Sequence, residues 1–327
     1  MTTPSAPVPR RRRVLRVVRW IAEGGLLLTA VLGLAIWWSV PDVAALRSNN
    51  PTTTAFIELR RDQADVLHRK FVMRWQWRSL RHISRYLRIA VVLAEDYRFY
   101  EHAGADWPAM WHAARTDFAK GTMHAGGSTI TQQLAKNLYL SPRRSLWRKA
   151  RELAIADQLE AELTKTRILE LYLNVVEWGD GVFGAEAAAQ FWFGRSASAL
   201  TPAQAARLAV ALPNPKTRSP NRQFGTLNRK CARLILGMHR LGVISTAEQT
   251  QALQELGVAK ADAEKADAEA VRNADQPIND SDDLADPPAP QAAPPPQTAP
   301  VEPSPPALPT APALHDDVTP DAAVKAI

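Results

Sequence analysis

Apolar residues recur every three or four positions along the middle of this chain, and that spacing predicts helices. The clearest examples are the segments ISRYLRIAVVLAEDYRF, LWRKARELAIADQLEAEL and TKTRILELYLNVV. Clusters of Gly, Pro, Ser and Thr separate these segments, and alternating β-branched runs are few. We therefore predict a mainly α fold, with one well-buried domain over residues 50–256.

An apolar run of a different kind stands near the N-terminus. Residues 20–40 read WIAEGGLLLTAVLGLAIWWSV, about the twenty residues that a helix needs to cross a membrane, with Glu23 as the only charge. The arginines within residues 1–19 mark that side as cytoplasmic. A cleaved signal peptide would have a shorter apolar region, and a helix of a soluble core would not explain the arginines. We predict a single-pass transmembrane anchor, with the domain outside the cytoplasm.

The composition changes again towards the C-terminus. Residues 259–327 consist mostly of Ala, Pro, Asp, Glu and Gln. Such a segment has too few large apolar side chains to offset the conformational entropy lost on ordering it. We predict a disordered tail rich in Pro and Ala, partly in the polyproline II conformation.

The charge balance indicates an anionic partner. The formal net charge is +7, and Arg and Lys crowd residues 60–151 while much of the acid lies in the tail. Nucleic acid is the usual partner of such a domain, but the anchor favours lipid phosphates, so we predict no nucleic-acid partner. Cys231 is the only cysteine, which excludes an intrachain disulfide and a CxxC metal or redox site.

Glu95 is the first candidate for chemistry. It ends the apolar stretch AVVLAE, and partial burial of a carboxyl raises its pKa towards the range that suits a general base. On spacing alone, an acid at a helix end that is followed three residues later by Arg98 is more often a solvated ion pair.

A polar cluster begins a helix in GGSTITQQLAKN. Thr129 and Gln132 have the spacing of a capping box. Gln132 with Lys136, and Gln133 with Asn137, are each four residues apart and form two polar rows on the helix. The pattern is that of an ordinary capped helix, or of a cradle for an oxyanion or a sugar at a helix N-terminus.

A third cluster, in LSPRRSLWRKARELAIADQLE, combines cations with a second carboxylate. Arg148 and Lys149 precede Glu152 by four and three residues, so they share one helical face with it. That face is either a salt-laced exposed surface or a pyrophosphate clamp. Between the two carboxylates, Trp107, Trp111 and Phe118 have the spacing of one helical stripe, which fits either core packing or an element that dips into a bilayer.

Taken together, five strings resemble the motifs of the lysozyme-like glycosyltransferase family 51. This family polymerises peptidoglycan from lipid II; it includes monofunctional biosynthetic peptidoglycan transglycosylases and the corresponding domain of class A penicillin-binding proteins. The strings are, in order, EDYRFYEHAG, GGSTITQQLAKNLYL, RKARE, ILELYLNVVEWGDGVFGAEAAAQFWFG and LTPAQAARLAVALPNP, within residues 80–222. The resemblance implies a lysozyme-like transglycosylase domain on the periplasmic side of a bacterial inner membrane.

The resemblance also implies roles for individual residues. Glu95 is implied as the general base, which takes the proton from the 4-hydroxyl of the lipid II acceptor as that oxygen attacks the anomeric carbon of the growing strand. The strand leaves undecaprenyl pyrophosphate with inversion to a β-1,4 link. Glu152 is implied as a second essential carboxylate, near the leaving group or its cations. The cations implied to neutralise the pyrophosphate are Lys136, Arg144, Arg148, Lys149 and Arg151. The residues implied to line or support the cleft are Asp96, Phe99, His102, Ser128, Thr129, Gln132, Gln133 and Asn137.

The sequence also departs from part of that family. No Ser is followed three residues later by Lys, so we predict a monofunctional protein without transpeptidase activity. We predict no obligatory cofactor and no dedicated metal site, although Mg²⁺ or Mn²⁺ would assist the pyrophosphate. The implied partners are lipid II, the growing glycan strand, the bilayer and proteins of cell-wall synthesis or division. A lytic glycan-cleaving enzyme and a non-catalytic membrane-anchored scaffold are the alternatives.

Overall fold

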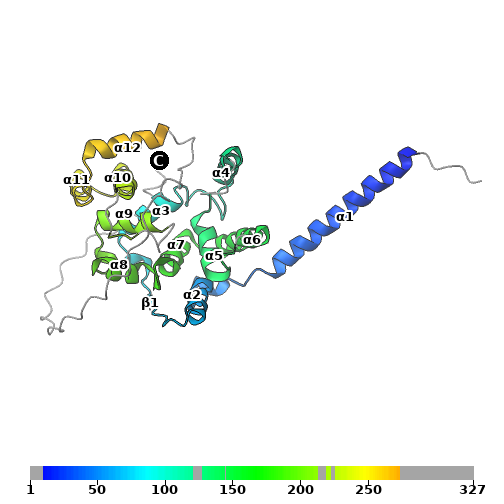
Figure 1. Ribbon diagram of the computed structural model, residues 1–327, viewed down its shortest axis with the longest axis horizontal. Coiled ribbons are helices and arrows are strands. Elements are labelled where there is room, and N and C mark those ends of the chain that lie inside the picture. The colour runs from blue at the N-terminus through cyan, green and yellow to red at the C-terminus, as the bar shows by residue number, and fades with distance from the viewer. Residues whose placement is uncertain (1–9, 121–126, 144, 213–218, 222–224, 273–327) are drawn as a thin grey trace, which may run out of the picture.

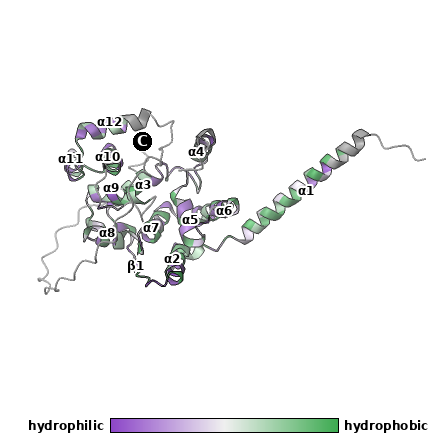
Figure 2. Cartoon of the chain, viewed as in Figure 1, coloured by the Kyte–Doolittle hydropathy of each residue, from purple (hydrophilic) through white to green (hydrophobic). Residues whose placement is uncertain are grey.

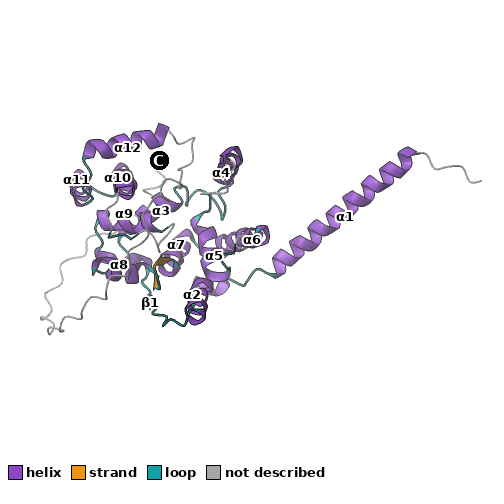
Figure 3. Cartoon of the chain, in the orientation of Figure 1, coloured by secondary structure: helices purple, strands orange, loops and turns teal. Residues whose placement is uncertain are grey.

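The structure, a computed structural model, describes residues 10–120, 127–143, 145–212, 219–221 and 225–272. Helices dominate this part of the chain, so the predicted mainly α fold is confirmed (Figure 3). The α-helices are α1 Arg10–Trp38, α2 Ala55–Val66, α3 Arg85–Glu95, α4 Trp107–Lys120, α5 Ile130–Tyr139, α6 Leu146–Glu162, α7 Lys165–Val175, α8 Ala185–Phe193, α9 Pro202–Ala211, α10 Gly225–Arg240, α11 Thr246–Glu255 and α12 Lys260–Arg272. The strands are β1 Arg74–Trp75, β2 Glu177–Gly179 and β3 Val182–Phe183, and the 3₁₀ turns are η1 Ala44–Arg47, η2 Leu80–His82 and η3 Ala197–Ala199.

Local sequence signals explain where the helices begin. A Ser or Thr side chain accepts a backbone N–H at the start of α2, α3, α5, α6, α7, α9 and α11, which satisfies a donor that the helix itself cannot pair. The apolar faces then pack into one core, in which α5 contacts α6 and α7, and α9 contacts α3 and α10 (Figure 1). This packing places the ends of α3, α5 and α6 near one another.

A small sheet follows α7. Strand β3 lies between β1, which is parallel to it, and β2, which is antiparallel to it. The chain turns from β3 into α8 at Gly184, whose φ is +79° and where a Cβ would lie 2.7 Å from the carbonyl oxygen of Asn174. Only glycine suits that turn without strain.

Helix α1 stands apart from the rest of the molecule. It projects from the domain beside α2 and α6, and its apolar part is visible as a nearly continuous green segment (Figure 2). The stretch Val18–Trp38 is long and apolar enough to cross a membrane, and none of it is buried in the protein. The predicted span over residues 20–40 therefore falls almost wholly within one exposed helix.

The ordered domain extends beyond both of its predicted boundaries. Val43 and Leu46 are buried in the core, so the domain begins before residue 50. At the other end, α12 occupies the start of the predicted tail, because its Ala-rich sequence favours a helix and Ala263 is buried where α12 packs on α10. The remainder of the predicted tail, residues 273–327, lies outside the described residues.

The exposed tryptophan side chains of α4 contradict one of the two interpretations of its stripe, that of core packing. Trp107 and Trp111 are 63% and 74% exposed, so they do not pack into the core. Phe118 is on the same helix, but its side chain lies outside the described ones. An exposed pair of tryptophans is typical of a surface that meets an apolar phase.

Candidate active site

Glu95 is the last residue of α3, and α5 holds its carboxylate. The Ser84 cap and the apolar face of the helix set the direction of α3, and Glu95 is half-buried at its C-terminal end. Gln133 Nε2 donates a hydrogen bond of 2.8 Å to Glu95 Oε2. The carboxylate is thus an acceptor in a defined orientation and does not simply project into solvent.

A buried tyrosine in turn orients Gln133. Tyr172, on α7, is fully buried, and its hydroxyl donates to Gln133 Oε1 over 2.9 Å. Burial, and then the charges of Glu95 and Asp96, raise the pKa of Tyr172 well above its ordinary value, so its hydroxyl stays protonated. With Oε1 occupied by this donor, the Gln133 amide presents its N–H₂ group to Glu95.

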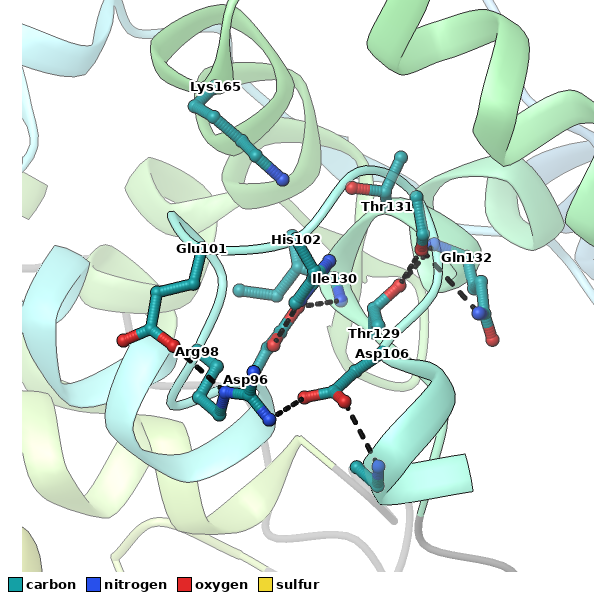
Figure 4. Close-up of polar contacts among 12 residues, drawn as sticks. Asp96, Arg98, Glu101, His102, Asp106, Thr129, Ile130, Thr131, Gln132 and Lys165 are labelled. Atoms are coloured by element: carbon teal, nitrogen blue, oxygen red, sulfur yellow. Dashed lines mark hydrogen bonds and ion pairs between the residues drawn. The ribbon is translucent and has the colours of Figure 1, made fainter. Parts of the chain in front are cut away.

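Asp96, the next residue, joins α3 to the start of α5. Its Oδ2 accepts the backbone N–H of Ile130 at 3.0 Å, and its Oδ1 lies 2.9 Å from His102 Nε2 (Figure 4). Both side chains are at least nine-tenths buried. His102 Nδ1 is buried and has no hydrogen-bond partner among the described residues. Phe99 is fully buried beneath this loop, where Lys165 Nζ lies 4.4 Å from the centre of its ring.

The N-terminus of α5 is built differently from the predicted capping box. Thr129 does cap the helix, because its Oγ1 accepts from Gln132 N and donates to the carbonyl of Gly104 (Figure 4). The reciprocal bond from the Gln132 side chain is not made, since Gln132 Oε1 accepts from Lys149 Nζ at 2.8 Å instead. The side chain that would complete a capping box is thereby used to attach α6 to α5.

Glu152 and its cations form the second half of the cluster. Glu152 is 3% exposed and is paired with Arg148 and, at 2.6 Å, with Lys149. Lys149 also donates to Ser128 Oγ at 3.0 Å, so it connects α6 to the segment before α5. The buried carboxylate has two cations within one turn of it and so fixes the positions of both.

Lys136 lies within the field of both carboxylates. Burial lowers the pKa of its ammonium group, and the charge of Glu152 opposes that shift. The charge of Glu95 opposes it too, whereas those of Arg148 and Lys149 add to it. Asn137, the residue after Lys136, donates from Nδ2 to the backbone carbonyl of Gln133 at 2.8 Å, so its side chain is bonded within α5.

One of the predicted cations, Arg151, is not in this cluster. Arg151 lies on the neighbouring strip of α6 and points away from Glu152, where it hydrogen-bonds Ser39. Arg144 lies outside the described residues. Within the described part of the chain, no group of three or more His, Cys, Asp or Glu side chains is arranged to hold a metal ion.

The sequence interpretation missed Tyr172 and Asp106. In the sequence, Tyr172 looks like one more apolar position of a helix. A buried tyrosine hydroxyl usually has a hydrogen-bond partner, and that requirement was the signal that could have indicated a polar contact here. Asp106 is buried at the start of α4, accepts the backbone N–H of Ala109 at 3.0 Å and lies near Arg98 (Figure 4). Its position before Trp107 and Pro108 is an N-cap pattern that the sequence shows.

A half-buried carboxylate, a second carboxylate that organises two cations and an adjacent lysine are suited to an enzyme that transfers a group away from an anionic leaving group. Comparison with known proteins defines the class further. The transglycosylase family model matches residues 64–239, which include α3, α5, α6 and α7. The chain belongs to this family, and glycosyl transfer is its reaction class.

Individual relatives agree with this assignment. The chain is 49% identical over 209 residues to the biosynthetic peptidoglycan transglycosylase of Azoarcus sp. (strain BH72), covering 63% of this chain and 89% of the relative. It is 44% identical over 214 residues to the protein of that name from Laribacter hongkongensis (strain HLHK9), covering 65% and 94%. It is 42% identical over 219 residues to the protein of that name from Nitrosospira multiformis, covering 67% of this chain and 95% of the relative.

Proposed function

We propose that this protein polymerises lipid II into β-1,4-linked glycan strands of peptidoglycan and releases undecaprenyl pyrophosphate. The observation that carries the proposal is the placement of Glu95, Lys136 and Glu152 in one cluster, within a chain of the transglycosylase family. The relatives named biosynthetic peptidoglycan transglycosylase support the choice of substrate.

In this proposal Glu95 is the general base. It takes the proton of the acceptor 4-hydroxyl while that oxygen attacks the anomeric carbon of the growing strand, and the bond from that carbon to the pyrophosphate breaks. The hydrogen bond from Gln133 supports this role, because it holds the carboxylate as an acceptor. Direct displacement inverts the anomeric centre and requires no covalent intermediate with the enzyme.

The cations stabilise the charge that leaves. Arg148 and Lys149 are held by Glu152, and Lys136 interacts electrostatically with both Glu95 and Glu152. Glu152 therefore acts as an organising anion that aims two cations at the pyrophosphate. A divalent ion brought by the pyrophosphate would add to them; Mg²⁺ and Mn²⁺ titration and EDTA test this, and full activity in EDTA rejects metal assistance.

The domain lies on the periplasmic side of the bacterial inner membrane in this proposal. The arginines before α1 support that orientation, and Trp107 and Trp111 offer an apolar contact with the outer leaflet. An alkaline phosphatase fused after Val40 is active only if that residue is outside the cytoplasm. The absence of a Ser-x-x-K motif supports a protein without transpeptidase activity. Proteins of cell-wall synthesis or division are its proposed partners.

The decisive experiment incubates the full-length protein with fluorescent lipid II and separates the products on a gel. We expect a muramidase-sensitive ladder that falls at least about a hundredfold in Glu95→Gln, the typical effect of removing a general base. Glu101→Gln is the matched control, because Glu101 is an exposed carboxylate paired with Arg98. An undiminished ladder in Glu95→Gln would exclude Glu95 as the base.

The same assay separates the alternatives. A lytic enzyme would shorten added glycan polymer and would leave lipid II monomers unpolymerised. A scaffold would do neither, although its thermal unfolding would be cooperative.

A further inference from the structure

The segment that leaves the membrane helix is bound to the catalytic domain at its first residue. Ser39 follows the last residue of α1, and Arg151 on α6 donates from Nε to Ser39 Oγ at 3.0 Å and from Nη2 to the Ser39 carbonyl at 3.1 Å. Ser39 Oγ donates to the carbonyl of Ile36 at 2.7 Å. The guanidinium therefore sits at the C-terminal end of α1, where unpaired carbonyls and the helix dipole favour a cation.

The following residues are attached as firmly. We define residues 39–50 as the exit segment. Its Val43 and Leu46 are 0% and 8% exposed and belong to the main hydrophobic core. Arg167 on α7 donates from Nε to the Leu46 carbonyl at 2.8 Å. Arg47 pairs with Glu162 at the far end of α6 and donates to the Glu162 carbonyl at 3.0 Å. The exit segment is thus part of the folded domain and is not a flexible tether.

Helix α6 connects this attachment to the candidate active site. Arg151 lies between Lys149 and Glu152 in sequence, and at 3.6 residues per turn it is about 60° around the helix from Arg148. One strip of α6 carries Glu152 and its two cations, and the neighbouring strip holds the end of α1. A shift of α6 by one helical turn along α1 would move the cluster by about 5 Å along the axis of α1.

We propose that Arg151 is a positioning residue that fixes the height and tilt of the catalytic domain over the bilayer. A substrate whose lipid tail stays in the membrane presents its sugar and pyrophosphate at a set depth, so the cluster must be held at that depth. This inference rests on the proposed function, and it assigns to Arg151 a role other than contact with the pyrophosphate.

The first test measures position directly and needs no activity. Spin labels are attached at Leu34→Cys, on the lipid-facing surface of α1, and at Asp157→Cys, on the exposed side of α6, in the full chain in nanodiscs. Cys231 is buried and stays unlabelled. We expect a narrow distance distribution in the parent protein that at least doubles in width in Arg151→Ala. Arg61→Ala, which removes an exposed arginine from α2, is the matched control.

An unchanged distribution in Arg151→Ala would overturn the proposal, whatever the polymerase assay shows. Arg151→Lys keeps the charge and loses the paired donors, so we expect a width between those of the parent and the alanine variant. A width equal to that of Arg151→Ala would show that the two-donor geometry carries the effect, which also fits the two bonds to Ser39.

The second test compares two substrates. With lipid II in a bilayer we expect Arg151→Ala to polymerise at least about tenfold more slowly, whereas with a water-soluble, short-chain lipid II analogue it should stay within about twofold of the parent. An equal loss with both substrates would overturn the proposal and return Arg151 to the pyrophosphate cations. If the parent polymerises neither substrate, the proposed function fails, and the distance measurement still decides how Arg151 acts on the anchor.

Discussion

Removing the Tyr172 hydroxyl tests the hydrogen-bonded order around Glu95. In Tyr172→Phe the ring remains, so the packing of a fully buried side chain is retained and only Oη is lost. Gln133 Oε1 then loses its donor, the Tyr172 hydroxyl, which lies 2.9 Å away in the parent protein. Its amide is able to turn that oxygen towards the Glu95 carboxylate, which removes the donor that orients the proposed base.

The expected magnitude follows from the burial of this chain of bonds. An unpaired buried acceptor costs on the order of 1–3 kcal/mol of folding stability. For a domain of this size, that loss lowers the Tm by roughly 2–12 °C. If about 1.4 kcal/mol of this loss also raises the activation free energy of proton transfer to Glu95, polymerisation slows about tenfold.

Thermal unfolding followed by tryptophan fluorescence, and lipid II polymerisation, measure the two effects on the full chain in detergent. Tyr139→Phe is the matched control, since Tyr139 is a half-buried tyrosine of α5 whose hydroxyl does not bond Gln133. A Tyr172→Phe protein with the Tm and rate of this control would refute the reasoning. A lower Tm with an unchanged rate would limit Tyr172 to a role in stability.

Three further predictions concern stability and reactivity. Asp96→Asn replaces one of the two carboxylate oxygens by an NH₂ group, so either the Ile130 N–H or His102 Nε2 loses its partner. We expect a stability loss of about 1–3 kcal/mol in denaturant titration. Gly184→Ala introduces a Cβ 2.7 Å from the Asn174 carbonyl at a φ of +79°, so we expect a loss of at least about 1 kcal/mol, and an unchanged midpoint would contradict the clash. Burial raises the pKa of Cys231 to about 12, so we expect maleimide at pH 8 to label it only after unfolding, as mass spectrometry would show.

The helices were predictable because their signals are local. The apolar spacing of α3, α6 and α7, and the Thr129 cap of α5, depend on residues within a few positions of one another. The grouping of Glu152 with Arg148 and Lys149 was predictable for the same reason, since four and three residues place side chains on one helical face.

What the sequence did not indicate depends on contacts between distant residues. Tyr172 and Gln133 are 39 positions apart, and Arg151 and Ser39 are 112 apart, so no spacing rule relates them. The Gln132 side chain shows the limit of local rules most clearly. Its spacing from Thr129 fits a capping box, but a lysine from another helix binds it instead. The start of α12 was missed because Ala263 is buried by tertiary packing of α12 on α10, which no local spacing indicates.

The adjacent residues Gln132 and Gln133 give α5 a function as a rigid spacer. Gln133 bonds Glu95 on one side, and Gln132 bonds Lys149, the partner of Glu152, on the other. Successive residues of a helix are rotated by about 100°, so the separation of the two carboxylates is set by helix phase and not by a loop. An insertion or deletion just before Gln132 should therefore be more damaging than a substitution of either glutamine, because one extra residue would turn both amides away from their partners at once.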